Sequence, residues 1–143
     1  MQVIVFSTII VLGLKILRGE KKMKLENLEI EDLVLDLKPL DHIMGKHAFI
    51  RAGQWDYERV TYDYKIGSKE KNITYYIRIQ GYAIEGDVDK GNAVIKLMTP
   101  LLGKYYYPHG VEYGEEENFP ENLVERAKNL VSNVKEEIAL YKK

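Results

Sequence analysis

Two segments in the middle of the chain alternate apolar and polar residues, and this pattern constrains the fold more than any other feature. Residues 60–66 and 73–80 both place an apolar or aromatic residue at every second position. A period of two is typical of a β-strand with one buried face. Because only the short polar stretch 67–72 separates them, the two segments are predicted to pair as an antiparallel hairpin. Shorter strands are predicted at 46–52, at 93–98 and after Leu101.

Two other segments have the periodicity of a helix. Near the N-terminus, apolar residues recur at the i, i+3, i+4, i+7 spacing of one helix face, namely Ile30, Leu33, Val34 and Leu37. We expect Asn27 to cap this helix and Pro39 to end it. Residues 120–141 are predicted to form a longer helix, with Pro120 in the first turn. The apolar stripe of this C-terminal helix comprises Leu123, Ala127, Leu130, Val134, Ile138 and Tyr141, widened by Val124 and Val131.

These elements predict an α+β fold. An antiparallel β-sheet of about four to five strands carries an N-terminal helix and a long C-terminal helix packed on one face. The opposite face is then left to solvent, as antiparallel sheets commonly allow. The alternation assigns the following side chains to that open face: Asp63, Lys65, Tyr76, Arg78, Gln80, Tyr82 and Lys96.

The first 22 residues differ from the remainder of the chain. Residues 3–14 are mostly apolar, and basic residues follow from Lys15. A membrane-spanning helix needs roughly 17–25 apolar residues, so this stretch is short for an anchor. We expect residues 1–22 to be an extension outside the fold, with translation starting at Met23 and residues 23–143 forming one domain. The alternative is a weak anchor over residues 3–17, with the domain on the cytoplasmic side because lysine and arginine follow the apolar run.

Composition restricts the classes of function. A chain of 143 residues suits a single domain, and its net charge of -1 creates no global field toward nucleic acid or anionic lipid. There is no cysteine, which excludes disulfides, thiol catalysis and cysteine-based zinc sites and fits a cytoplasmic location. None of the three serines, Ser7, Ser68 and Ser132, lies in a Gly-x-Ser-x-Gly elbow, so a serine hydrolase is not expected.

An ordered set of short motifs resembles one known family. The motifs are Gly53-Gln-Trp-Asp-Tyr, Tyr62-Asp-Tyr-Lys, Tyr76-Ile-Arg-Ile, Ile84-Glu-Gly-Asp-Val-Asp and Lys96-Leu-Met-Thr-Pro-Leu-Leu. In this order they resemble the YugN-like proteins of Bacillus-type bacteria, which have no assigned activity. The resemblance covers about half of the chain, from Leu37 to Tyr113. It implies a cytosolic α+β domain and carries over no catalytic residue.

The candidate site is the open sheet face. The side chains proposed to bind a ligand or partner are Trp55, Asp63, Tyr76, Arg78, Tyr82 and Lys96. Asp63, Arg78 and Lys96 are expected to line up across three neighbouring strands, either as a cross-strand charge ladder or as an anion site walled by aromatic rings. The first hypothesis is a non-catalytic binding or adaptor module that engages a protein or small ligand. The alternative is a small enzyme that uses Asp63 or Asp56 with Arg78.

Metal and nucleic-acid sites have weaker support. His109 and the acids from Glu112 to Glu117 match no ligand spacing, and Asp87–Gly91 lacks the pattern of a calcium loop, so neither a metal nor a cofactor is expected. Lys104 precedes three tyrosines, but the nearby glutamates repel phosphate and argue against a nucleic-acid partner. A membrane partner is expected only if residues 1–22 insert, and the sequence also allows a homodimer.

Overall fold

The fold is organised around one long central strand. The computed structural model describes residues 19–53, 57–67, 73–106 and 119–142. Strand β5 (Ile73–Glu85) pairs antiparallel with β4 (Arg59–Gly67) along the whole length of β4, from Arg59↔Tyr82 to Gly67↔Thr74. The hairpin predicted from the alternating segments is thereby confirmed. On the outer edge of β4, the two-residue strand β3 (Ile50–Arg51) is all that forms of the strand predicted at 46–52.

The other edge of β5 is shared by two strands. β6 (Val94–Leu97) pairs with the second half of β5, and β7 (Leu101–Tyr106) pairs with the first half. Both run antiparallel to β5, and the amide of Met98 donates a hydrogen bond to the Gln80 carbonyl between them. Together, β6 and β7 follow the edge of β5 like one strand that is interrupted at residues 98–100. These three residues lie opposite only two residues of β5, Ile79 and Gln80. This irregularity is a bulge.

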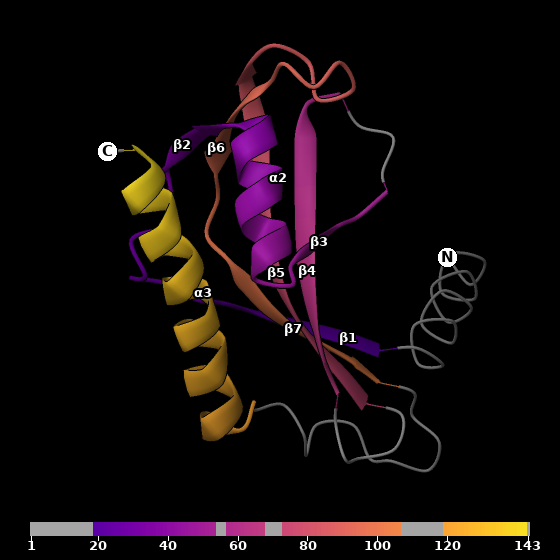
Figure 1. The fold of residues 1–143 in the computed structure, drawn as a ribbon. Coiled ribbons are helices and arrows are strands. Elements are labelled where there is room, and N and C mark those ends of the chain that lie inside the picture. The colour runs from indigo at the N-terminus through magenta and orange to yellow at the C-terminus, as the bar shows by residue number, and fades with distance from the viewer. Residues whose placement is uncertain (1–18, 54–56, 68–72, 107–118, 143) are drawn as a thin grey trace, which may run out of the picture.

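Two further short strands pair with the outer edges of β7 and β6. β1 (Gly19–Lys24) pairs with β7, and β2 (Val34–Asp36) pairs with β6, so the described sheet has seven strands, all antiparallel (Figure 1). β1 crosses the boundary proposed after residue 22, and residues 19–22 pair with β7. This pairing assigns those four residues to the sheet, whereas residues 1–18 lie outside the described part of the chain.

The N-terminal helix is present, but its predicted position was wrong. The helix α2 spans Leu37–Lys46, while residues 27–33 form an irregular loop between β1 and β2. Asn27, Glu29 and Asp32 have φ values of 64°, 62° and 69°. Such left-handed conformations cannot continue a right-handed helix. Pro39 does not end a helix; it lies in the first turn of α2, where a missing amide hydrogen costs no helical hydrogen bond.

The C-terminal helix α3 (Glu121–Lys142) agrees with the prediction in place and length. Its buried stripe consists of Leu123, Ala127, Val131, Val134 and Ile138. Leu130 is only partly buried, and Tyr141 is 56% exposed, so the centre of the stripe is shifted by one residue from the predicted one. The helix therefore packs along Val131 rather than Leu130.

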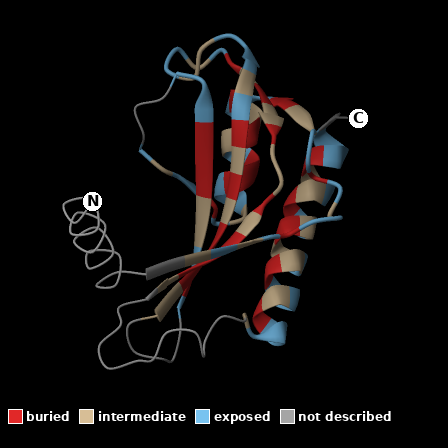
Figure 2. Cartoon of the chain, turned by 180° about the vertical axis from the view of Figure 1, so that it is seen from behind, coloured by how far each residue is buried: buried red, intermediate tan, exposed pale blue. Residues whose placement is uncertain are grey.

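Both helices lie on the same side of the sheet (Figure 1). The side chains of the strands that point to this side are mostly buried, and in the view from behind the strands pass in front of α2 while α3 stands beside them (Figure 2). The hydrophobic core therefore lies between one face of the sheet and the two helices α2 and α3. This arrangement is the predicted α+β architecture. In the described part of the chain, neither helix combines the length and apolar character needed to cross a bilayer.

A polar contact joins the two helices at the edge of this layer. Glu137 of α3 accepts a hydrogen bond from Nε2 of His47 at 2.9 Å and pairs with Nζ of Lys46 at 2.9 Å. The hydrogen bond from Lys46, followed by that from His47, lowers the pKa of Glu137 below its ordinary value of 4.5. The carboxylate form is therefore favoured in the folded protein.

The first prediction concerns the α3 stripe. Replacing Ile138 by alanine removes a fully buried side chain from the core, whereas Leu140 on the same helix is 71% exposed. Ile138→Ala should lower the free energy of unfolding by about 2–5 kcal/mol. The matched control Leu140→Ala should change it by less than about 0.5 kcal/mol. Urea titration followed by circular dichroism measures both, and equal effects at the two positions would show that α3 does not pack as described.

The second prediction follows from Glu137. Because its pKa is lower in the folded than in the unfolded state, its contribution to stability is present above pH 4.5 and is lost as the pH falls through the folded pKa. Acid therefore destabilises the wild type partly by protonating Glu137. Glu137→Gln removes this contribution, so the free energy of unfolding of the variant should fall less than that of the wild type between pH 4.5 and the folded pKa. Thermal melts at a series of pH values measure the difference. Parallel curves for the two proteins would contradict the assignment.

Candidate functional site

The sheet face opposite the helices is built from rows of side chains that the strand register defines. Directly paired residues of neighbouring strands point to the same side of a sheet. At one end, Tyr82 of β5 lies between Arg59 of β4 and Lys96 of β6. Six residues earlier on β5, Tyr76 is paired with Lys65 on β4 and with Gly103 on β7, and Lys22 of β1 follows Gly103 in the same row.

Between these rows, Asp63 and Arg78 form a bidentate charge pair. They are register partners, and the guanidinium donates from Nε to Oδ1 at 2.8 Å and from Nη2 to Oδ2 at 2.9 Å. The hydrogen bond that Arg78 donates to Asp63 is the main cause that raises the pKa of Arg78, against the opposing effect of burial. Both carboxylate oxygens of Asp63 are engaged in this pair. The geometry suits a fixed structural pair better than a general base.

Tyr76 connects this pair to the next strand. Its ring stacks on that of Tyr105, with centroids 4.8 Å apart, and the guanidinium carbon of Arg78 lies 4.6 Å from its centroid. A Cβ atom at Gly103 would overlap the Tyr76 ring, so the ring lies across the glycine. Tyr76 is only 4% exposed as a result. The prediction of a solvated Tyr76 was wrong, because neighbouring side chains cover it on its own face.

Lys96 does not join Asp63 and Arg78. It is the register partner of Tyr82, four residues beyond Arg78 on β5, which is about 13 Å along a strand. Its Nζ lies 3.7 Å from Oδ1 of Asp32 instead. The prediction that Asp63, Arg78 and Lys96 line up across three strands is therefore wrong, because Lys96 is on the strand that pairs with the other half of β5.

Some of the remaining candidate residues are exposed to solvent, and others lie outside the part of the chain that the structure describes. Tyr82 is 39% exposed and Ile84, two residues further along β5, is 47% exposed. Trp55 and Asp56, the other proposed residues, lie outside the described part of the chain, as do His109 and the glutamates that follow it. Among the described residues no group of three or more histidine, aspartate and glutamate side chains is placed to hold a metal ion.

Two contributors to the face were missed by the sequence analysis. Tyr105 and Gly103 belong to the strand predicted after Leu101, which was not assigned to a face; their alternate spacing on that strand puts both on the face that carries Tyr76. A glycine two residues before a tyrosine in a short strand was the available signal. It has meaning only once the partner strand and its register are known.

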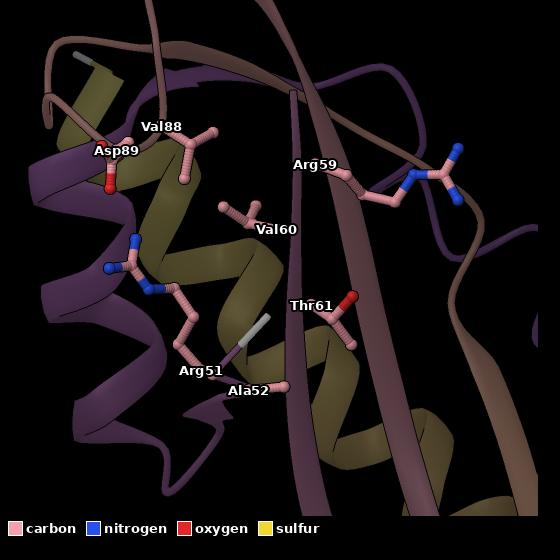
Figure 3. A pocket seen from close by; sticks show the side chains of 8 residues that line it. Arg51, Ala52, Arg59, Val60, Thr61, Val88 and Asp89 are labelled. Carbon is pink, nitrogen blue, oxygen red and sulfur yellow. The ribbon is translucent and has the colours of Figure 1, made fainter. Parts of the chain in front are cut away.

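A pocket of about 320 Å³ lies at the edge of the sheet, beside β3 and the start of β4. Figure 3 shows Arg51 pointing toward the turn that carries Val88 and Asp89, whereas Arg59 points away from that turn. The two guanidinium groups lie on opposite sides of the sheet and do not converge on one ligand position. Neither Asp63 nor Arg78 lines this pocket, so their charge pair does not lie in a concave binding site formed by it.

A second polar cluster supports Arg51 from the helix side. The hydroxyl of Tyr62 donates to Oδ1 of Asp41 in α2 at 2.5 Å, and Nη1 of Arg51 lies 3.4 Å from Oδ2 of the same carboxylate. Burial, followed by the hydrogen bond to Asp41, raises the pKa of Tyr62 above its ordinary value. Tyr62 therefore stays protonated and acts as a donor. The cluster fastens α2 to β3 and β4.

Comparison with known proteins gives one consistent group. The family described as the YugN-like family matches residues 25–137. The chain is 56% identical over 105 residues to the uncharacterized protein YlbA of Bacillus subtilis, covering 73% of this chain and 86% of YlbA. It is 25% identical over 76 residues to the uncharacterized protein YugN of the same organism, covering 53% of this chain and 55% of YugN.

A solved structure supports the fold as well. The crystal structure of the uncharacterized conserved protein YugN from Geobacillus kaustophilus superposes with a TM-score of 0.74 at 52% sequence identity. The match covers 84% of this chain and 98% of the other. The family resemblance inferred from the short motifs is confirmed.

The third prediction tests the packing of Tyr76 on Gly103. Gly103→Ala should lower the free energy of unfolding by about 1–3 kcal/mol, because the added methyl group overlaps the ring. In a Tyr76→Ala background the same change should cost less than about 0.5 kcal/mol, since the two sites are coupled. Gly67→Ala, where an added Cβ meets nothing within 4 Å, is the control. A Gly103→Ala cost that is the same in both backgrounds would contradict the described contact.

Proposed function

We propose that this chain, which belongs to the YugN-like family, is a non-catalytic cytoplasmic binding module whose open sheet face engages a macromolecular partner. The observation that carries the proposal is the row Arg59–Tyr82–Lys96, in which an exposed tyrosine on the central strand lies between two basic residues. Tyrosine and arginine are enriched among residues that dominate binding energy at protein interfaces. The cytoplasmic location rests on the absence of cysteine.

The face is also rigid enough to serve as a recognition surface. β5 is hydrogen-bonded to neighbours on both edges, and the Asp63–Arg78 pair, the Tyr76–Tyr105 stack and the Gln80–Thr61 hydrogen bond of 3.2 Å fix the side chains between the rows. A preformed surface loses little conformational entropy on binding. These contacts support a role for Asp63, Tyr76 and Arg78 in holding the surface, with Tyr82 and Lys96 in contact with the partner.

The fourth prediction tests the face by cross-linking. A photo-reactive phenylalanine analogue in place of Tyr82 should give discrete adducts when illuminated in the native cells. The same analogue at Glu125, exposed on α3 on the other side of the molecule, should give none. Gel shifts followed by mass spectrometry identify the adducts. Adducts from position 125 only, or from neither position, would overturn the open face as the interaction surface.

A further inference from the structure

The two ends of the open face carry charges of opposite sign. At one end, Glu85 of β5 and Asp36 of β2 lie in one row, on either side of a residue of β6. At the other end, the row that contains Tyr76 begins with Lys65 of β4, and Lys22 at its far side already interacts within the chain. Glu85, Asp36 and Lys65 are exposed, and among the described residues none of the three has an ion pair.

Between these end rows, most charges are balanced within the chain. Arg78 binds Asp63, and Nζ of Lys96 lies 3.7 Å from a carboxylate oxygen of Asp32. Lys24, which lies in the Asp63–Arg78 row on the basic half of the face, has no ion pair in the described part of the chain. The sign of the face therefore changes along β5, from an acidic end row through a nearly neutral middle to a basic end row.

A half-turn exchanges the two ends of this face. The axis lies in the plane of the sheet and runs across the strands along the row of Thr61 and Gln80. Gln80 is four residues from Tyr76 and five from Glu85, and the bulge in β5 takes up the extra residue. Both halves have the same layout of strands, because β6 with β2 and β7 with β1 lie on the same side of β5. A second copy turned in this way opposes its acidic row to the basic row of the first, and the contact occurs twice.

We propose that the partner of the open face is a second copy of this chain, bound face to face as a two-fold symmetric dimer in which Glu85 of each copy meets Lys65 of the other. The inference rests on the proposed function and identifies its macromolecular partner. Charge complementarity across an interface directs encounter and selects the partner. A partner with one sign of charge, such as a nucleic acid, would meet a row of like charge at one end of the face.

Apolar side chains are also available for this contact. Ile50 and Tyr82 are exposed and lie on the open face by register, and exposed Ile84 follows Tyr82 two positions along β5. The half-turn places Tyr82 opposite Arg78 of the second copy, and a guanidinium group stacks well on an aromatic ring. An aromatic side chain near the centre with charged residues at the rim is the usual composition of a specific interface.

The size of the face suits a dimer. From Tyr76 to Glu85 it extends over nine residues of β5, which is about 30 Å, and four neighbouring strands are about 19 Å wide. This gives a contact of about 600 Å² per copy before the relief of the side chains is counted. A standard protein interface buries roughly 800 Å² per partner, so the open face approaches the area that a stable dimer needs.

The experiment measures the oligomeric state by sedimentation equilibrium. The wild type should change from monomer to dimer as its concentration rises from about 0.1 to 100 μM, since interfaces of standard size have micromolar or tighter affinities. Glu85→Lys and Lys65→Glu should each raise the dissociation constant of the dimer by about tenfold or more, because each brings like charges together at both symmetric contacts. The two changes combined in one chain should restore the dissociation constant to within about threefold of the wild type.

Rescue by the combined variant identifies a contact between copies. The residue of β5 that pairs with Lys65 is Tyr76, which is nine residues or about 30 Å from Glu85, so the two charges cannot meet within one chain. Glu125→Lys is the control, since it makes the same change in net charge as Glu85→Lys at an exposed position of α3. It should change the dissociation constant by less than about twofold. Thermal melts verify that all variants are folded.

Three results would overturn the inference. They are a wild type that is still monomeric at about 100 μM, a dimer that neither single change weakens, and a dimer that both single changes weaken but their combination does not restore. If the chain is monomeric while the photo-reactive analogue at position 82 gives adducts with another protein, the second copy is wrong and the binding face stands. If neither dimers nor adducts are found, the proposed function fails as well.

Discussion

The structure depends on β5 being hydrogen-bonded along both edges. Residues 74–82 of β5 pair with β4 on one side, and β7 and then β6 pair with β5 in succession on the other. A central strand with both edges paired leaves few backbone groups to be satisfied by other means. It also fixes the two faces of the sheet: one is apolar and receives α2 and α3, and the other collects Arg78, Gln80 and Tyr82. The core and the candidate site are two sides of the same strand.

The sequence predicted those elements whose pattern the structure uses directly. Alternation over 60–66 and 73–80 located the central hairpin, and the long apolar stripe located α3. The error near the N-terminus has a definite cause. Ile30, Leu33 and Leu37 have helical spacing, but Ile30 fills the core from a loop, and Leu37 does so from the first turn of the true helix. Periodicity reports which residues are buried, and it identifies a helix only if the backbone between them is continuous.

The candidate site was predictable only within the hairpin. Asp63 and Arg78 are brought together by the β4–β5 register, which follows from two alternating segments joined by a short link. Lys96, Gly103 and Tyr105 depend on how β6 and β7 divide the opposite edge of β5, and the extra residue at 98–100 sets that division. A bulge leaves no periodic signal in the sequence. The aromatic stack and the separate position of Lys96 therefore came from the structure.

The pairing of β1 has a consequence for the order in which the sheet assembles. Its only strand neighbour in the described sheet is β7, and the paired residues are about 80 positions apart in the chain. Because β1 can pair only after β7 has docked on β5, we expect it to join the sheet late and to separate from it early. Its amide hydrogens should exchange with solvent sooner than those of the β4–β5 hairpin. The edge that bears Lys22 and Lys24 is thus expected to be the part of the open face that opens first.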